Sequence, residues 1–346
     1  MKNKVFVFLR IAASFGMLGL LFWIMRDEIR DIWGTIVKCD VSFLVLAGFF
    51  LFADTVMLGF RLTTVFKGEN LNVSFKKSFQ LTYLGYYFNN FMPSAVGGDI
   101  IKAYYASRDS SKEKIRSYAS VFMDRFIGLC TLLIIAAVAL VIDNGKVNQP
   151  EVKKLVYILL AIGVVVFSIV MNKTVAGVMK KIFSKVKVFR IGEHLDNLYR
   201  IVHDYRNRKT IVSKAVVMSI VAQYFYFLTV YFFFLAVGAN MSLGNIFLIM
   251  PIVTFISMVP SIGGLGFREG AMVIFFSSLA GREAAFAVSL LLLFGLLAIS
   301  IIGGAIYLWW GFSRARSSSQ VKNRRIYDEN TCDSRTEFGS FRKEGS

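Results

Sequence analysis

Residues 89–102 read NNFMPSAVGGDIIK, and this stretch decides how the surrounding chain can fold. Pro93 removes a backbone donor, while Gly97 and Gly98 allow backbone conformations that a side chain would forbid. Asp99 follows at once, inside an otherwise apolar region. In lipid, broken backbone and ionisable side chains are tolerated only where they are buried in protein or line a wet cavity. The stretch therefore predicts a broken, polar segment that marks the working site.

The composition around this stretch is that of a polytopic membrane protein. Of the 346 residues, 56% are hydrophobic and 18% are charged, whereas a soluble domain has about 25% charged residues. The formal net charge is +18, but the basic residues lie between apolar runs, where the positive-inside rule and anionic lipid account for them. Since the sequence has no nucleic-acid motif, we expect contact with membrane lipids and not with nucleic acid.

Six apolar runs are long enough to cross a bilayer as helices, which takes about 20 residues each. They cover residues 5–25, 41–60, 118–142, 155–171, 215–237 and 284–310. Two further apolar regions, about 79–101 and 246–279, are interrupted by Pro and Gly. Each of these two either crosses the membrane once or returns as a re-entrant hairpin.

The distribution of Lys and Arg decides between these alternatives. If both broken regions are hairpins, 31 of the 40 Lys and Arg residues face the cytoplasm, 7 face outward and two are intramembrane. If each region crossed once, the basic loops at residues 102–116 and 172–214 would face outward, against the positive-inside bias. The sequence therefore predicts an all-α polytopic membrane protein of about six full transmembrane helices plus two broken, re-entrant helical hairpins. Both termini are expected in the cytoplasm.

The two broken regions share a short pattern. Residues 93–99 read PSAVGGD and residues 260–269 read PSIGGLGFRE, so that Pro-Ser is followed by a Gly pair and then by an acid. Hairpins that dip from opposite faces are what an inverted repeat produces. We therefore expect two inverted halves.

Two segments differ from the rest of the predicted membrane domain, residues 1–312. Residues 172–213 place apolar side chains at helical spacing beside Lys, which predicts two cytoplasmic amphipathic helices in the headgroup layer, or alternatively a gate or a docking surface. Residues 313–346 mix charge and Ser, which predicts a disordered cytoplasmic tail.

The sequence predicts no metal site and no cofactor. Cys39, Cys130 and Cys332 are far apart and lack a C-x-x-C spacing. The two histidines, His194 and His203, lie in a basic amphipathic segment without a carboxylate cluster at ligand spacing.

Charged residues at depth are the strongest candidates for function. Arg125 lies about 10 Å below the interface at 1.5 Å per residue, and Asp124 lies beside it. Consecutive helical residues point about 100° apart, so each of the two should need its own partner. Asp54 and Asp99 are both candidate partners for Arg125.

Arg268 and Glu269 form the corresponding adjacent pair in the second broken region, and we expect them to face different directions as well. The charged set has two interpretations. In one, Arg125 and Arg268 bind an anionic phosphate headgroup while the acids shape, balance or proton-couple the site. In the other, the charges are structural latches that pin the hairpins to the bundle.

Three motifs, in this order and spacing, carry a resemblance to a known family: YFNNFMPSAVGGDIIKAYY, ASVFMDRFIGL and VPSIGGLGFREGA. They resemble the flippase-like membrane domain of the lysylphosphatidylglycerol synthase transmembrane family, over about residues 5–312. The resemblance implies a multi-pass inner-membrane protein that moves lipid-linked substrates between leaflets. The polar motif positions that it implies are Asn90, Pro93, Gly98, Asp99, Asp124, Arg125, Pro260, Gly264, Gly266, Arg268 and Glu269. To these we add Asn89, Gly97 and Asp54 as supporting positions.

The resemblance leaves the substrate and the role open. Bifunctional members carry a fused aminoacyltransferase domain, and this sequence has only the tail, so we do not expect an enzyme. The favoured function is a translocator of a phospholipid, aminoacyl-lipid, glycolipid or polyprenyl-linked substrate. One alternative is a membrane scaffold whose basic loop docks a cytosolic lipid-modifying enzyme, and another is a membrane-embedded glycosyl or lipid transferase. An oligomer is compatible with each.

Overall fold

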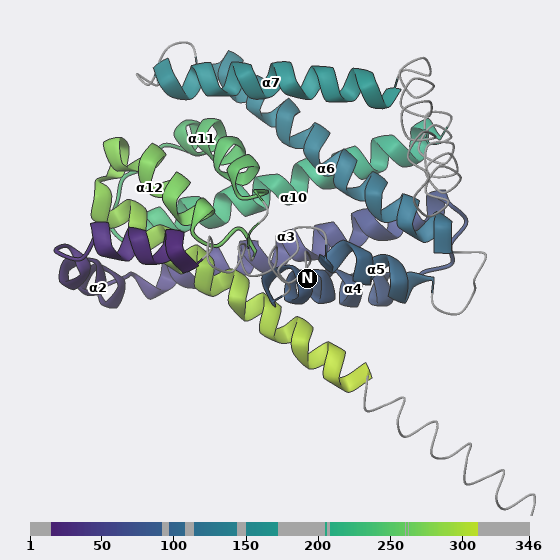
Figure 1. Ribbon diagram of the computed structural model, residues 1–346, viewed down its shortest axis with the longest axis horizontal. Helices are drawn as coiled ribbons and strands as arrows, with labels where there is room; N and C mark the ends of the chain where they lie inside the picture. The colour runs from purple at the N-terminus through teal and green to yellow at the C-terminus, as the bar shows by residue number, and fades with distance from the viewer. Residues whose placement is uncertain are drawn as a thin grey trace, which may run out of the picture. The chain divides into compact units, whose positions relative to one another are not determined.

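The computed structural model describes residues 15–91, 97–107, 114–143, 150–171, 205, 208–259, 261 and 263–310. Within these ranges every regular element is a helix, in agreement with the predicted fold class (Figure 1). The chain forms two compact units, Met1–Gly303 and Gly304–Ser346. Of the second unit, the described part is residues 304–310, the last turns of the final helix.

Four helices in the described part of the chain are long and apolar enough to cross a membrane. They are α3 (Val41–Gly68), α6 (Lys114–Asp143), α10 (Lys209–Ala236) and the helix Arg282–Trp310. Three more helices accompany them, namely Phe15–Ile24, α2 (Ile29–Val37) and α7 (Pro150–Met171). The protein is therefore a polytopic membrane protein.

The helices extend beyond the apolar runs that predicted them. α3 continues eight residues past position 60, and α10 begins six residues before position 215. Hydropathy marks only the part of a helix that suits lipid, whereas backbone hydrogen bonding continues wherever polar side chains find partners. Arg61, which sequence reasoning assigned to a cytoplasmic loop, thus lies inside α3 and is only 7% exposed.

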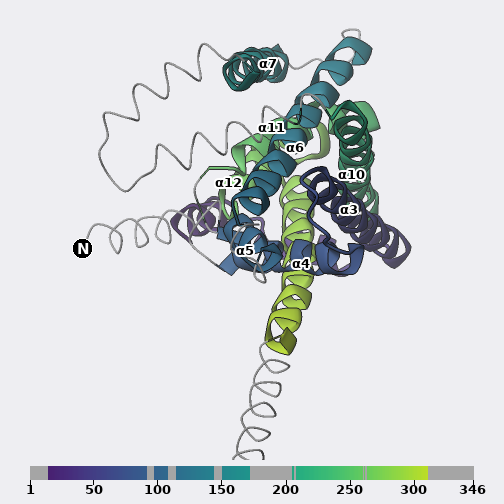
Figure 2. The same cartoon turned by 90° about the vertical axis from the view of Figure 1, so that its right-hand side faces the viewer.

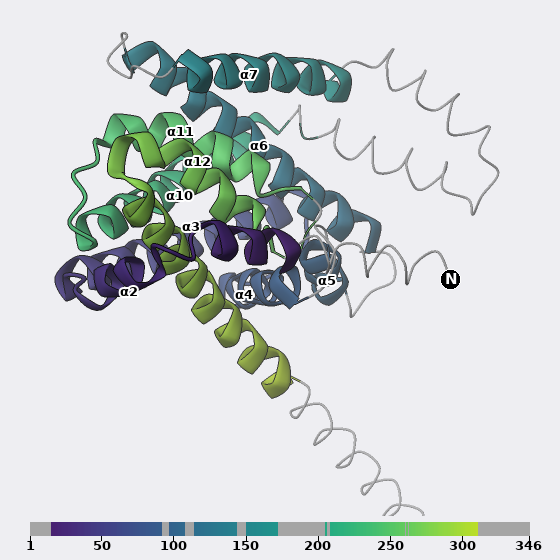
Figure 3. The ribbon, with the colours of Figure 1, turned by 60° about the vertical axis from the view of Figure 1, so that its left-hand side comes forward.

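Both interrupted regions are pairs of shorter helices, as predicted. The first is α4 (Phe75–Phe91) followed by α5 (Gly97–Ala106), and the second is α11 (Leu243–Ile256) followed by α12 (Phe267–Ala280). The members of each pair lie side by side (Figure 3). In the second region the break follows from positive φ angles of 59° at Gly263, 79° at Gly264 and 84° at Gly266, which side chains rarely adopt.

The element order repeats after α6. In each half a long helix precedes a hairpin, and a second long helix follows it. α3 and α10 have 28 residues each, and α6 with 30 residues corresponds to the helix Arg282–Trp310 with 29. The acids correspond too, since Asp99 is the third residue of α5 and Glu269 is the third residue of α12.

The two equivalent helices α3 and α10 pack along each other and run in opposite directions (Figure 2). The backbone N–H of Asp40, at the start of α3, donates to the carbonyl of Ala236, at the end of α10. Phe50 stacks on Phe232 with ring centroids 5.3 Å apart, and Thr64 donates to the sulfur of Met218 at the other end. Antiparallel packing of corresponding helices is what an inverted repeat requires.

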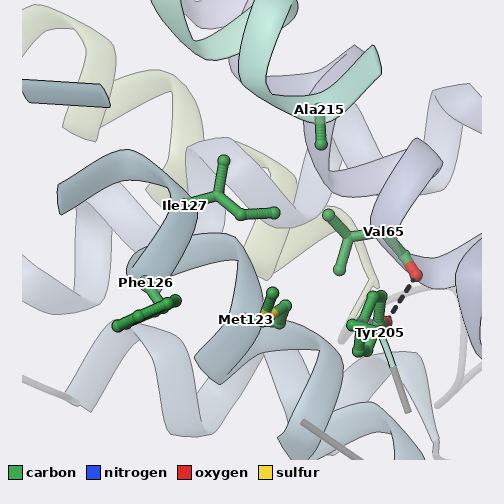
Figure 4. Packing of buried hydrophobic residues seen from close by; sticks show 6 residues of the cluster. All are labelled: Val65, Met123, Phe126, Ile127, Tyr205 and Ala215. Carbon is green, nitrogen blue, oxygen red and sulfur yellow. Dashed lines mark hydrogen bonds between the residues drawn. The ribbon is translucent and has the colours of Figure 1, made fainter. Parts of the chain in front are cut away.

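Tyr205 belongs to a cluster of buried hydrophobic residues (Figure 4). Tyr205 is fully buried, and its hydroxyl donates to the carbonyl of Val65, 2.9 Å away. Burial raises the pKa of Tyr205, so the hydroxyl stays neutral and keeps this hydrogen bond. The ring packs among side chains of α6 and α10, and Gly68 leaves room for it. Tyr205, four residues before the start of α10, is thereby anchored to α3.

Several predicted features lie outside the described residues. They are Pro93, Pro260, most of the amphipathic segment 172–213 and the tail 313–346. Residues 209–213 of the predicted amphipathic segment form the first turns of α10.

Candidate functional site

The first hairpin is clamped by close backbone contact at Gly98. A Cβ at this position would lie 2.3 Å from the carbonyl oxygen of Gly85 on α4, so only Gly fits. The backbone N–H of Gly98 donates to Oδ1 of Asn89, 3.0 Å away, and satisfies one of the free donors at the start of α5. Gly98 and Asn89 thus hold Asp99 at a fixed place near the helix N-terminus.

Asp99 joins two cations. Its Oδ2 lies 2.7 Å from Nε of Arg125 on α6, and its Oδ1 lies 3.5 Å from Nζ of Lys102, one turn along α5. Of the two candidate partners for Arg125, Asp99 is therefore the one that contacts it. The side chains of Asp99 and Lys102 are 10% and 9% exposed, whereas that of Arg125 is 47% exposed. One carboxylate thus serves two cations, and only Arg125 is accessible.

Asp124 has a different partner, as its direction on the helix predicted. Arg61 on α3 donates from Nε to Oδ1 at 2.7 Å and from Nη2 to Oδ2 at 3.0 Å. Its Nη1 donates to the hydroxyl of Ser219 on α10 at 2.8 Å. This two-pronged, buried ion pair ties three long helices together.

The pair continues into a buried hydrogen-bond network between α6 and α10. The hydroxyls of Ser219 and Thr131 lie 2.7 Å apart. Nε2 of Gln223 donates to the carbonyl of Gly128 at 2.8 Å and to Thr131 at 3.1 Å. Sequence reasoning missed Arg61, Ser219 and Gln223. One signal was available in the sequence. Asp124 lies at depth with no cation on its own helix face, so a cation from another helix had to reach it.

The second hairpin carries the adjacent pair Arg268 and Glu269, and here the prediction of different directions is wrong. Nε of Arg268 donates to Oε1 of Glu269 at 3.1 Å, and Nη2 contacts the same oxygen. The other oxygen, Oε2, accepts from the backbone N–H of Gly266 at 2.6 Å. The long Arg side chain folds back at the helix N-terminus, where Glu269 caps the free donor, so the two charges satisfy each other.

Asp54 on α3 is not the partner of Arg125. It is 4% exposed, and its Oδ2 lies 3.4 Å from the hydroxyl of Tyr86 on α4. The contact between Asp54 and Tyr86 joins α3 to the first hairpin.

The two broken regions meet at Asn90. Its Nδ2 donates to the hydroxyl of Ser300 on the helix Arg282–Trp310. A Cβ at Gly263 would lie 2.2 Å from Oδ1 of Asn90 and 3.2 Å from its Cα. Asn90 of the first hairpin therefore packs directly against the glycine turn of the second.

Among the described residues, no group of three or more His, Cys, Asp or Glu side chains lies close enough to hold a metal ion. In the described part of the chain most charged side chains at depth form ion pairs, whereas Asp54 contacts Tyr86.

An inverted pair of broken hairpins around intramembrane ion pairs defines a polytopic membrane protein with a polar site at depth, as in transporters built from inverted repeats. The family model for the lysylphosphatidylglycerol synthase TM region matches residues 7–306. The chain belongs to this family.

Similar proteins come from archaea. A UPF0104 membrane protein of Pyrococcus horikoshii is 25% identical over 319 residues, which cover 84% of this chain and 93% of that protein. A UPF0104 membrane protein of Methanothermobacter thermautotrophicus is 24% identical, covering 80% and 86% of the two chains. A third, from Methanocaldococcus jannaschii, is 22% identical, covering 76% and 81%. Each is named as a membrane protein, and the sequence match covers most of both chains.

Proposed function

We propose that this protein moves a lipid between the two leaflets and that Arg125 binds the phosphate of the headgroup. The observation that carries the proposal is the exposure of Arg125. Its side chain is 47% exposed, whereas the other ion-paired side chains at depth, on Arg61, Lys102, Asp99, Asp124, Arg268 and Glu269, are at most 10% exposed.

The guanidinium of Arg125 has donors to spare. Its Nε is used by Asp99, and in the described part of the chain its two terminal nitrogens have no further hydrogen-bond partner. A guanidinium presents a planar fork of N–H donors that matches two phosphate oxygens. Because Asp99 is shared with Lys102, this corner of the site also carries a surplus positive charge that favours an anion.

The surroundings of Arg125 suit a lipid. Phe122 and Tyr118 precede it by three and seven residues on α6, so all three side chains lie on one side of the helix. Both aromatic residues are exposed, at 44% and 39%. A charged group next to exposed aromatic rings can hold a headgroup while the acyl chains stay along the apolar surface.

Arg268 is assigned a different role. It is 5% exposed and its guanidinium is occupied by Glu269, which also caps Gly266. We therefore assign Arg268 and Glu269 to shaping the second hairpin and Arg125 to binding substrate. The contact between Asn90 and Gly263 is the place where the hairpins would separate when a headgroup passes.

The experiment is leaflet-resolved lipid analysis of cells that contain the wild-type protein, no protein, or Arg125→Ala. Arg282→Ala is the matched control, because Arg282 is an exposed Arg whose side chain is 62% exposed. We expect one class of phosphate-bearing lipid to change its leaflet distribution without the protein. The wild type and Arg282→Ala should restore the distribution, and Arg125→Ala should not.

Two outcomes count against the proposal. An unchanged leaflet distribution of every lipid class would refute translocation. A change in the total amount of one lipid, with its leaflet ratio unchanged, would favour a scaffold that assists a lipid-modifying enzyme.

A further inference from the structure

Asp54 is the unusual acid of the site. The other three intramembrane acids, Asp99, Asp124 and Glu269, each contact a cation. Asp54 is equally buried, at 4% exposure, yet in the described part of the chain it forms no ion pair and has one hydrogen-bond partner, Tyr86, at 3.4 Å. It is the fourteenth of 28 residues in α3, about 20 Å from either end at 1.5 Å per residue.

A carboxylate in this position is costly to keep ionised. Burial without a cation disfavours the charged form, and an isolated charge at mid-membrane is among the most expensive groups in a protein. Binding a proton removes that cost and breaks no ion pair. Asp54 is therefore the acid of this site that can gain and lose a proton while the other three remain paired.

The groups that face Asp54 come from every helix packed on α3. α4 contributes Tyr86 and α10 contributes Tyr226, while Arg61 lies seven residues along α3 and is held by Asp124 of α6. Arg125 is paired with Asp99, and Arg268 is paired with Glu269, so neither Arg forms an ion pair with Asp54. The helix Arg282–Trp310 meets α3 at Leu51 and has no ionisable side chain between positions 284 and 306.

The formal charge of the cluster makes this proton consequential. Four cations (Arg61, Lys102, Arg125 and Arg268) stand against four acids (Asp54, Asp99, Asp124 and Glu269). With all acids ionised the cluster is neutral, and with Asp54 protonated it carries one positive charge. A phosphodiester headgroup carries one negative charge, so the protonated cluster and the headgroup neutralise each other.

We propose that Asp54 is a proton-binding site and that each anionic headgroup enters the cluster together with one proton. The inference rests on the proposed translocation and extends it, because it makes the movement proton-coupled. The proton is taken from water on the side where the lipid enters and returned where the lipid leaves, and no bond of the lipid is broken. Linkage requires that the proton favours the headgroup and that the headgroup favours the proton to the same extent.

The test is calorimetric binding of a short-chain phosphatidylglycerol to the purified full chain in micelles, from about pH 5 to about pH 9. At each pH, buffers of different ionisation enthalpy report the protons taken up on binding. The wild type should take up close to one proton per lipid at the alkaline end and none at the acid end. Its affinity should fall as the pH rises, by about tenfold per pH unit where a full proton is taken up.

Asp54→Asn should bind the lipid with no proton uptake and no pH dependence, and the exposed-acid control Glu283→Gln should behave as the wild type. Proton uptake that persists in Asp54→Asn overturns the proposal. If Asp54→Asn does not fold, the wild-type titration decides alone, since lipid binding without proton uptake at any pH overturns the proposal. That result leaves translocation standing, whereas a wild-type protein that neither binds nor moves the lipid overturns both.

Discussion

Arg61 and Asp124 show how a charge is kept deep in this protein. Each is buried, and the two make a pair of short hydrogen bonds that Ser219 completes. Gly128, one turn after Asp124, leaves room for the guanidinium, since a Cβ there would lie 3.1 Å from Nη1 of Arg61. This pair is a buried structural tie, whereas Arg125 is paired with Asp99 and its side chain is 47% exposed.

The tie can be tested with Arg61→Met, Asp124→Leu and the double variant. Removing one partner leaves a buried charge alone, so each single variant should lower the free energy of unfolding by about 3–5 kcal/mol. The double variant removes both charges and should lose clearly less than the sum of the two. The measurement is reversible unfolding in mixed micelles, and strictly additive losses would contradict the assignment.

For the charged residues, the sequence predicted the directions of the side chains on the helix better than it predicted their ion-pair partners. Asp124 and Arg125 point apart on one helix, so separate partners were expected, and Asp99 was one of the two candidates for Arg125. The sequence did not identify Arg61 as the partner of Asp124, because Arg61 lies beyond the apolar run. The two residues are 63 positions apart, and only the fold brings them together. Arg268 and Glu269 were misjudged because helical direction ignores the reach of a long side chain.

The hairpins are the elements on which the site is built. The turn of the second hairpin contains Gly263, Gly264 and Gly266 at positive φ, and α5 of the first hairpin begins with Gly97 and Gly98. In each hairpin an acid is the third residue of the second helix. The acid of the second hairpin caps its own helix, whereas the acid of the first hairpin reaches α6. The two hairpins thus share a backbone plan but only the first presents a shared carboxylate to an exposed cation.

Gly98→Ala tests the clamp of the first hairpin. Its Cβ would lie 2.3 Å from a backbone oxygen and 2.6 Å from Oδ1 of Asn89, so α5 must shift. We expect a loss of about 1–3 kcal/mol in the free energy of unfolding and a matching loss of transport. Gly48→Ala is the control, because a Cβ at this helical position on α3 meets nothing within 4 Å. Equal stability of the two variants would count against the clamp.

The sequence located both hairpins but placed the helix ends poorly. Pro and Gly mark where backbone hydrogen bonding stops, and they were read correctly as breaks within apolar regions. The ends of α3 and α10 were placed too near the membrane centre, because a polar side chain that is paired inside the protein has the same hydropathy as one in a loop.

At the scale of the whole molecule, the two inverted halves are alike in their helices and unlike in their charges. Arg125 is the twelfth residue of α6, and the twelfth residue of the helix Arg282–Trp310 is Leu293. Arg61 is the twenty-first residue of α3, and α10 has Thr229 at that position. The second half has the buried pair Arg268 and Glu269 but lacks an Arg at the positions that correspond to Arg61 and Arg125.

The most direct test of this account is translocation by the purified chain alone. Vesicles that contain the wild type, Arg125→Ala or Arg282→Ala would carry a fluorescent anionic phospholipid whose inner and outer pools are counted by a membrane-impermeant quencher. The wild type and Arg282→Ala should exchange the lipid rapidly between leaflets. A folded Arg125→Ala should exchange it only at the rate of protein-free vesicles. Exchange by Arg125→Ala at the wild-type rate would contradict this account.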